Sequence, residues 1–462
     1  MGKSLPVLNS VFNSLASLGS STVSKFETLR PGTGIDAPGD GRTVDDFKPY
    51  LVALNLTSRC NLKCDHCYLD ATTKMGGGDD ELTTEECFRL IDQIAEVNQG
   101  SLLVITGGEP LVRPDILDIA RHAVKHQFMV VFGTNGMLID DAMAKQMVEI
   151  GVMGVGISID SLDAAKHNAF RGLPNAWEGA LAGIEACKRN GLQFQVHFSA
   201  QPMNYQELPA VIDWSHDLGA KVLNVFFMVC TGRGEELTDI SPSQYEEVLT
   251  HLIESQDKYQ DMLVRARCAP HFKRLAYEKD PNSPITKAQG YMGGGCLAGT
   301  NYARVTPNGD LTPCPYMPLS AGNIKDNSFV DLWEKSEIFD SFRYPHLKGK
   351  CGDCEFSEIC GGCRARPYVD HGDWMDEDEW CLYTPKGGEK IQVAFNVPES
   401  SSVEWDQASE ERLSRIPYFL RAMVKKGVER HATEQGIPVV TIELMEELRK
   451  RRFGNEKPVF KF

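Results

Sequence analysis

The sequence predicts an α/β protein in which a partial (β/α)6 barrel is followed by a cysteine-rich extension and a small helical C-terminal domain. Between residues 50 and 234, six apolar runs of strand length alternate with amphipathic stretches, a pattern typical of parallel strands joined by helices. After about Gly234 the alternation stops, and a region rich in Cys, Gly and Pro begins. Six units indicate a partial TIM-type barrel, because a complete one has eight.

The expected elements follow one another in regular order. The strands are expected at Leu51–Leu56, Leu102–Thr106, Met129–Gly133, Gly154–Ile159, Phe194–Phe198 and Val222–Val229. Helices are expected between them at Thr84–Val97, Asp115–Lys125, Asp141–Ile150, Ala176–Asn190 and Leu208–Leu218, then at Ser243–Gln256. From Cys268 to about Pro385 we expect short hairpins and loops organised by metal. The tail, Ser409–Arg452, again has helical spacing of its apolar residues.

These patterns divide the chain into five segments. They are an N-terminal extension (1–47), the partial barrel (48–234), the cysteine-rich domain (235–385), a linker (386–407) and the helical C-terminal domain (408–462).

Composition excludes several classes of protein. A formal net charge of -16 disfavours nucleic-acid binding and attachment to anionic lipid. No run of 18 apolar residues predicts a membrane span, and the N-terminus has no compact apolar segment of a signal peptide. We therefore expect a cytoplasmic protein without nucleic-acid or membrane partners.

The chain has 14 cysteines, most of them in tight clusters. Clustered cysteines in a chain without an export signal favour metal binding over disulfides. Cys87, Cys187 and Cys230 are different, because they lie inside apolar or amphipathic segments and are expected to be buried structural thiols.

The first cluster follows the first expected strand and has the spacing C-x3-C-x2-C: Cys60-Asn-Leu-Lys-Cys64-Asp-His-Cys67. Three thiolates on a [4Fe–4S] cluster leave one iron open for a small chelating ligand. A zinc site would need a fourth ligand, and His66 lies between two of the cysteines, where it cannot easily join the same tetrahedron. The spacing therefore favours iron–sulfur over zinc.

This motif resembles the defining motif of the radical S-adenosylmethionine (SAM) superfamily. The resemblance continues at later strand ends, where Thr106-Gly-Gly-Glu-Pro110, Thr134-Asn-Gly136 and Ser158-Ile-Asp160 match places at which members contact SAM. It implies that Cys60, Cys64 and Cys67 hold the catalytic cluster and that one-electron reduction cleaves SAM to a 5′-deoxyadenosyl radical. Glu109 would bind the methionine ammonium. The further SAM contacts that it implies are Gly107, Gly108, Thr134, Asn135, Ser158 and Asp160.

The later cysteines resemble the SPASM extension of radical SAM enzymes, which carries up to two auxiliary [4Fe–4S] clusters. By this resemblance one cluster takes Cys268, Cys296, Cys314 and Cys363, and the other takes Cys351, Cys354, Cys360 and Cys381. A structural zinc ribbon over residues 351–363 and a single auxiliary cluster both remain open. A flavodoxin- or ferredoxin-type electron donor is the expected redox partner.

Local segments point to a substrate class. Arg267-Cys-Ala-Pro-His271, Gly295-Cys-Leu-Ala-Gly299 and Pro313-Cys-Pro-Tyr316 resemble enzymes of haem d1 and alternative haem synthesis, either didecarboxysirohaem deacetylases or haem synthases. The tail from Glu410 resembles the C-terminal domain of a protochlorophyllide reductase subunit, although a helical docking module is an equal alternative. Both resemblances imply a tetrapyrrole substrate. The alternative is a peptide maturase, but residues 1–47 are short and irregular for the leader-recognition domain that it needs.

Overall fold

The computed structural model describes most of the chain from Phe47 onward. The described residues are 47–71, 80–229, 231–236, 239–256, 258–259, 261–287, 295–391, 403–414, 424–425, 427–429, 431–433 and 435–453. Almost all of the expected N-terminal extension, much of the expected linker, and Cys230 lie outside these residues. Cys87 and Cys187 are buried, as expected for structural thiols.

A nine-stranded sheet forms the centre of the structure, in the order β7-β6-β5-β4-β3-β2-β1-β8-β9. All neighbours are parallel except β9, which is antiparallel to β8. Six strands match the expected ones: β1 (Leu51–Asn55), β2 (Leu102–Thr106), β3 (Met129–Thr134), β4 (Gly154–Ser158), β5 (Phe194–Ala200) and β6 (Val222–Phe227). Among the described residues the two edge strands, β7 and β9, do not pair to close a barrel.

Three further strands lie beyond the expected six. β7 (Leu263–Arg267) pairs with β6, so the parallel sheet continues past residue 234. β8 (Tyr302–Val305) returns to pair with β1, and β9 (Leu311–Thr312) follows it. The cysteine-rich region is therefore joined to both edges of the sheet, rather than following it as a separate set of hairpins.

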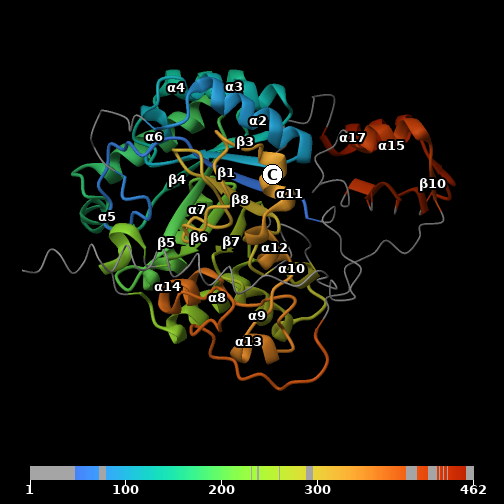
Figure 1. Cartoon of the computed structure of the whole chain (residues 1–462). Coiled ribbons are helices and arrows are strands. Elements are labelled where there is room, and N and C mark those ends of the chain that lie inside the picture. Colours follow the sequence, from blue (N-terminus) through green and yellow to red (C-terminus); the bar gives the residue numbers. More distant parts are fainter. Residues whose placement is uncertain are drawn as a thin grey trace, which may run out of the picture. The chain divides into compact units, whose positions relative to one another are not determined.

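Helices connect the parallel strands at nearly the expected positions. They are α2 (Thr84–Asn98), α3 (Ile116–Lys125), α4 (Asp141–Ile150), α5 (Ala164–Arg171), α6 (Ala176–Asn190), α7 (Leu208–Asp217) and α8 (Pro242–Ser255). α2, α3, α4 and α6 lie together along one side of the sheet (Figure 1). α2 begins at a capping box, in which the Thr83 side chain accepts from Glu86 N and the Glu86 carboxylate accepts from Thr83 N.

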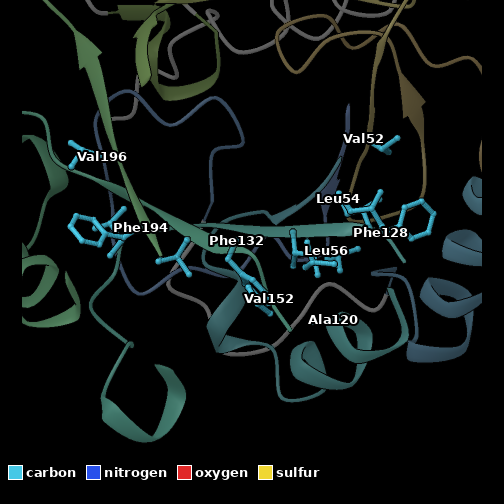
Figure 2. Close-up of a cluster of buried hydrophobic side chains, with 14 of the residues drawn as sticks. Val52, Leu54, Leu56, Ala120, Phe128, Phe132, Val152, Phe194 and Val196 are labelled. Carbon is cyan, nitrogen blue, oxygen red and sulfur yellow. The ribbon is translucent and has the colours of Figure 1, made fainter. Parts of the chain in front are cut away.

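The two faces of the sheet differ because side chains alternate along each strand. The outer face carries fully buried apolar side chains that pack against the helices, among them Leu54, Phe132 and Val196 (Figure 2). The inner face is more polar and less buried. Strand register aligns four of its side chains across β4 to β7, in one row: Ser158, His197, Asn224 and Arg265.

The cysteine-rich region contains more helix than expected. Its helices are α9 (His271–Lys279), α10 (Pro284–Lys287), α11 (Phe329–Lys335), α12 (Glu337–Arg343), α13 (Gly349–Asp353) and α14 (Ala365–His371). The expectation of short hairpins and loops was wrong here, because α11 and α12 bury Trp333 and Phe339 in the same apolar core as the sheet.

The C-terminal residues form a separate small core. β10 (Glu404–Trp405) pairs in parallel with β11 (Val439–Val440), beside α15 (Gln407–Ser414) and α17 (Ile442–Phe453). β10 lies inside the segment expected to be linker. The buried members of this core are Val403, Val428, Ala432, Val440, Leu444 and Met445.

Candidate functional site

The three-cysteine loop leaves the end of β1 and is fastened to the end of β2. Gly108 N donates to Thr57 O and Glu109 N donates to Arg59 O, both at 2.8 Å. A Cβ atom on Gly107 would lie 2.4 Å from Thr57 O, and one on Gly108 would lie 2.3 Å from Arg59 O. Only glycine therefore permits this contact, and the Gly-Gly pair sets the position of the loop that begins at Cys60.

Each sulfur of this loop lies near one N–H donor. Leu62 N lies 3.4 Å from Cys60 Sγ, and Ala71 N lies 3.4 Å from Cys67 Sγ. Burial raises the pKa of the Cys60 thiol to about 12, so this sulfur loses its proton only when a metal takes its place. N–H donors toward sulfur are a feature of iron–sulfur ligands, whose potential they adjust.

Arg171 is the donor to the third sulfur, and no motif in the sequence pointed to it. Arg171 Nη1 lies 3.7 Å from Cys64 Sγ, while its Nε donates to Asp160 Oδ2 at 2.6 Å. Burial acts to lower the pKa of Arg171, but Asp160 and Cys64 outweigh it and raise that pKa. Asp160 Oδ1 accepts from Ser199 N at 3.1 Å. Both oxygens of Asp160 are thus engaged within the protein, and its carboxylate orients Arg171.

Arg233 holds the loop from the other side. Its Nε donates to Cys64 O at 3.0 Å and its Nη1 donates to Asp70 Oδ1 at 2.7 Å. The backbone there is in a short 3-10 helix, η4 (Gly232–Glu236), and Gly232 has φ +61 with no room for a Cβ beside Cys67 O. The segment Thr231-Gly-Arg-Gly234, which follows β6, therefore holds the cysteine loop in position.

Glu109 lies at the end of β2, 1% exposed, with its carboxylate directed at the end of β3. It accepts hydrogen bonds from Thr134 Oγ1 at 2.8 Å, Asn135 N at 2.8 Å and Leu111 N at 3.1 Å. Within the described part of the chain no Lys, Arg or His forms an ion pair with it, and burial raises the pKa of Glu109 to about 7. A buried carboxylate without a counter-ion is suited to a ligand that brings N–H groups or positive charge.

The remaining expected SAM contacts lie at the same edge of the sheet. Asn135 Nδ2 donates to Asn61 Oδ1 at 2.7 Å, which links the end of β3 to the cysteine loop. Ser158 ends β4 and is half-buried. On β5, the His197 ring lies so close to Gly156 of the neighbouring strand β4 that a Cβ atom on Gly156 would be 2.2 Å from the ring. Burial, and then the charges of Arg267 and Arg171, lower the pKa of His197 to about 3, so the ring is neutral.

The first auxiliary quartet comes together from four separate segments. Cys268 follows β7 with φ 58, Cys296 precedes β8, and Cys314 follows β9. Burial raises the pKa of the Cys314 thiol well above its usual value, and three neighbouring sulfurs raise it further: Cys296, Cys268 and Cys363. The structure therefore brings these four cysteines to one place.

The second auxiliary quartet lines one cavity. All four sulfur-bearing residues, Cys351, Cys354, Cys360 and Cys381, surround about 320 Å³ that protein atoms do not fill. Phe356 N lies 3.4 Å from Cys354 Sγ, and Arg364 Nη2 lies 3.7 Å from Cys351 Sγ. The structure thus groups the eight later cysteines into the two expected sets.

Asp378 lies between the two quartets and is fully buried. Its N–H donates to Cys351 Sγ at 3.5 Å, and its Oδ2 accepts from Cys363 N at 2.7 Å and from Arg366 Nη1 at 3.0 Å. His271 Nε2 lies 3.5 Å from the same oxygen. One residue thus contacts a cysteine of each set, Cys351 through its backbone N–H and Cys363 through its carboxylate. The sequence did not single it out, because nothing in the local pattern shows that position 378 lies beside both.

The first loop and the first quartet are joined by aromatic rings. Tyr68, which follows Cys67, meets Tyr316, which lies two residues after Cys314, edge to face at 5.6 Å between ring centroids. Tyr68 OH accepts from Asn55 Nδ2 at 2.9 Å, and the Arg304 guanidinium lies 5.7 Å from the Tyr68 ring centroid. The two half-buried tyrosine rings therefore lie between the first loop and the first quartet.

Sulfur spacing distinguishes between zinc and a larger metal group. In a zinc tetrahedron with Zn–S bonds of ~2.3 Å, the sulfurs lie about 3.8 Å apart. Among the described residues, no three cysteine sulfurs lie within 4.8 Å of one another. The described cysteines are thus spaced more widely than the ligands of a formed zinc tetrahedron, whereas a cubane holds its sulfurs further apart because each binds a different iron.

A parallel α/β sheet with an open three-cysteine loop after its first strand, and with further cysteine quartets, defines an iron–sulfur enzyme that binds a small chelating cofactor. Models of protein families match three parts of the chain: the radical SAM superfamily at residues 54–215, the SPASM iron–sulfur cluster-binding domain at 296–355, and the proto-chlorophyllide reductase 57 kD subunit at 405–449. The chain belongs to the radical SAM superfamily. It is an enzyme of that superfamily, with [4Fe–4S] clusters and SAM as cofactors.

Relatives with names are similar to this chain over most of its length. An AdoMet-dependent heme synthase of Methanosarcina barkeri is 39% identical over 73% of this chain and 97% of its own length. A pre-heme d1 synthase of Dinoroseobacter shibae is 31% identical over 72% of this chain and 86% of its own. Among solved structures, Streptococcus suis SuiB bound to SAM is similar in fold, with a TM-score of 0.59 and 17% identity over 73% of this chain and 78% of that one.

In the described part of the chain, no helix combines the length and apolarity needed to cross a bilayer.

Proposed function

We propose that this enzyme uses radical SAM chemistry to modify side chains of a haem- or sirohaem-type tetrapyrrole, in haem or haem d1 synthesis. The observation that carries the proposal is the 39% identity to an enzyme named AdoMet-dependent heme synthase, which this chain matches over 97% of that enzyme's length. The match runs over 343 residues, 73% of this chain, so it extends beyond either the barrel or the cysteine-rich region alone.

Cys60, Cys64 and Cys67 hold the catalytic cluster in this proposal, and the fourth iron is left for SAM. When bound, the reduced cluster and SAM supply a 5′-deoxyadenosyl radical, which takes hydrogen from the substrate. Glu109 accepts hydrogen bonds from the amino group of SAM, and its lack of a protein counter-ion supports this role. Gly107 and Gly108 keep the strand end against the loop, as their contacts with Thr57 and Arg59 support.

The other SAM-site residues take two kinds of role. Thr134 and Asn135 orient the Glu109 carboxylate, and Asn135 also reaches Asn61 in the cysteine loop. Ser158 faces the inner side of the sheet and contacts the cofactor. Asp160 is a positioning residue rather than a direct contact, because both of its oxygens are engaged by Arg171 and Ser199. It acts through Arg171 on the sulfur of Cys64.

We assign the two cysteine quartets to two auxiliary [4Fe–4S] clusters, one on Cys268, Cys296, Cys314 and Cys363 and the other on Cys351, Cys354, Cys360 and Cys381. The cavity lined by the second quartet and the sulfur spacing support this assignment. A radical left on the substrate after hydrogen removal loses one more electron when an oxidised product forms. An auxiliary cluster near the substrate is placed to receive that electron.

The inner face of the sheet suits a substrate with several carboxylates. Three arginines lie on this face in a chain of net charge -16: Arg265 and Arg267 on β7 and Arg304 on β8. Arg267 Nε donates to Asn224 Oδ1 at 2.8 Å, and Arg304 Nη1 donates to Pro315 O at 2.7 Å. A guanidinium is a charged donor that suits the acetate and propionate carboxylates of such a substrate.

A peptide maturase is the alternative. The likeness to SuiB supports the shared fold alone, since identity is 17%. The C-terminal residues matching the proto-chlorophyllide reductase subunit favour a tetrapyrrole over a peptide. We further propose that the enzyme works in the cytoplasm and is reduced by a flavodoxin- or ferredoxin-type donor, because an open iron site requires a reducing setting.

The test is an anaerobic assay of the reconstituted, reduced protein with iron-coproporphyrin or didecarboxysirohaem, measuring 5′-deoxyadenosine. Stimulation by one tetrapyrrole supports the proposal and identifies decarboxylation or deacetylation as the reaction. Cleavage that neither tetrapyrrole changes would overturn the substrate and favour the peptide alternative. Cys64→Ala should abolish cleavage, whereas the matched control Cys187→Ala, at a buried thiol outside every cluster, should retain it.

A further inference from the structure

Two histidines and an aspartate converge on the outer surface of the helical layer, away from the cysteines. His122 and His126 are four residues apart on α3 and at its C-terminal end, so both rings lie on one face of the helix. Asp92 comes from the neighbouring α2. One ligand atom from each residue lies within 4.8 Å of the other two, the one such group of His, Cys, Asp or Glu among the residues that the structure describes.

Both imidazoles are directed at the same atom. His122 Nε2 lies 2.7 Å from Asp92 Oδ1, and His126 Nε2 lies 2.9 Å from it. Phe88 stacks on the His122 ring at 4.3 Å between centroids, which fixes the plane of that ring. His126 caps α3, with its N–H bonded to the carbonyls of Ala123 and His122. The rings are therefore held by packing and by the backbone, rather than by their contact with Asp92 alone.

We propose that Asp92, His122 and His126 form a binding site for a divalent transition-metal ion such as Zn²⁺, Ni²⁺ or Cu²⁺. Bonds of ~2.0–2.2 Å in a tetrahedron separate ligand atoms by about 3.3 Å, so the trio needs to open by only a few tenths of an ångström. Imidazole ligands select these metals over Mg²⁺ and Ca²⁺, which prefer oxygen.

Two features of the surroundings favour a cation here. The C-terminal end of α3 carries the negative end of the helix dipole. The side chains of Asp92, His126 and His122 are 49%, 33% and 23% exposed, which leaves one side of the site open for water as a fourth ligand. A bound ion would join α2 to α3, the two helices connected through β2, whose end carries Glu109. This inference does not depend on the proposed substrate.

The experiment uses tag-free protein with all clusters loaded, because empty cysteine sites would themselves take up zinc. Zn²⁺ is titrated by calorimetry into the wild type, the double variant His122→Gln/His126→Gln and the control His216→Gln. His216 contacts Asp261 Oδ1 through Nε2 at 3.1 Å and Asp217 Oδ1 through Nδ1 at 3.5 Å, so its carboxylates face different ring nitrogens, and it joins no three-ligand group among the described residues. Iron content and thermal midpoint in EDTA establish that each variant is folded and loaded.

The wild type and His216→Gln should bind one more equivalent of Zn²⁺ than the double variant, and Mg²⁺ at the same concentration should show no such site. Cu²⁺ added to the wild type should give an EPR spectrum split by two imidazole nitrogens. Because this measurement uses only the wild type, it tests the site even if the double variant does not fold. Equal zinc stoichiometry in the wild type and the double variant, or a copper spectrum without nitrogen splitting, would overturn the site. So would equal binding of Mg²⁺.

Discussion

At the residue scale, Glu109 is the side chain on which we expect SAM binding to depend most. It is buried, holds three hydrogen bonds from the protein, and has no cationic partner among the described side chains. Glu109→Gln keeps the size but removes the charge, and losing one partner of a buried charged contact costs about 2–5 kcal/mol. We expect the Kd for SAM to rise at least ~30-fold by equilibrium binding to the loaded protein. An unchanged Kd would exclude this role.

The raised pKa of Glu109 makes SAM binding depend on pH. Only the carboxylate accepts the amino N–H groups, so affinity should be constant well above pH 7 and fall about tenfold per unit below it. Stability of the ligand-free protein has the opposite dependence. Because the folded-state pKa of about 7 exceeds the usual 4.5, the folded state is favoured by protonation, and stability falls as pH rises through this window. Glu109→Gln should remove both pH dependences, which a pH series of binding and thermal midpoints would measure.

At the scale of elements, the contact between the end of β2 and the cysteine loop predicts the effect of Gly108→Ala. The added Cβ would lie 2.3 Å from Arg59 O, a backbone atom that cannot move without shifting Cys60. Overpacking of this kind costs about 1–3 kcal/mol. We expect loss of the iron of the catalytic cluster while the auxiliary iron remains, measured by iron analysis and Mössbauer spectroscopy. The matched control is Gly427→Ala, where nothing lies within 4 Å of the new atom.

Asp378 couples two loops of the cysteine-rich region and should set the potential of both auxiliary clusters. Its carboxylate is a buried negative charge beside Cys363, and its N–H reaches Cys351. Asp378→Asn removes that charge, which favours the reduced, more negative form of each cluster and raises both reduction potentials. EPR-monitored redox titration measures this, with the exposed Glu379→Gln as control. Potentials that do not move would argue against the coupling.

The elements most predictable from sequence were those formed by local patterns. The six strands and their helices follow from alternating apolar runs, and α4 and α6 have the expected bounds. The sequence missed β7 because its LVRAR pattern places arginines on the inner face, which conceals the strand among polar residues. It missed β8 pairing with β1 because that contact joins segments far apart in the chain.

The site residues divide in the same way, into those that a local motif indicates and those that only the tertiary fold brings together. Motif spacing indicated Cys60, Cys64 and Cys67, because a short loop must bring them together, whereas Glu109 was proposed by resemblance to the superfamily's motif. Arg171, Arg233 and Asp378 each act on a cysteine from a remote segment. Their roles depend on tertiary packing that no local pattern records. The later cysteines could be grouped only by resemblance, since their spacing permits several pairings.

At the scale of the whole molecule, the C-terminal core is self-contained and supplies no proposed cluster ligand. A chain ending at Ile391 should therefore keep its iron and its substrate-independent cleavage of SAM. Iron analysis and a 5′-deoxyadenosine assay without tetrapyrrole check this. Loss of auxiliary iron on truncation would contradict the expected independence. Comparing tetrapyrrole binding by the full and shortened chains then measures what the C-terminal residues add to substrate recognition.

The pairing of β1 with β8 bears on how the protein is made. Strands β2 to β7 each pair with the strand before them, so this part of the sheet can assemble as it leaves the ribosome. β8 emerges about 250 residues after β1, and contacts so distant in sequence form late. Until then one edge of β1 has no neighbour, and an unpaired edge is prone to aggregation. The loop with Cys60, Cys64 and Cys67 is thus synthesised before any of the later cluster cysteines, so its thiols leave the ribosome while β1 still lacks this neighbour.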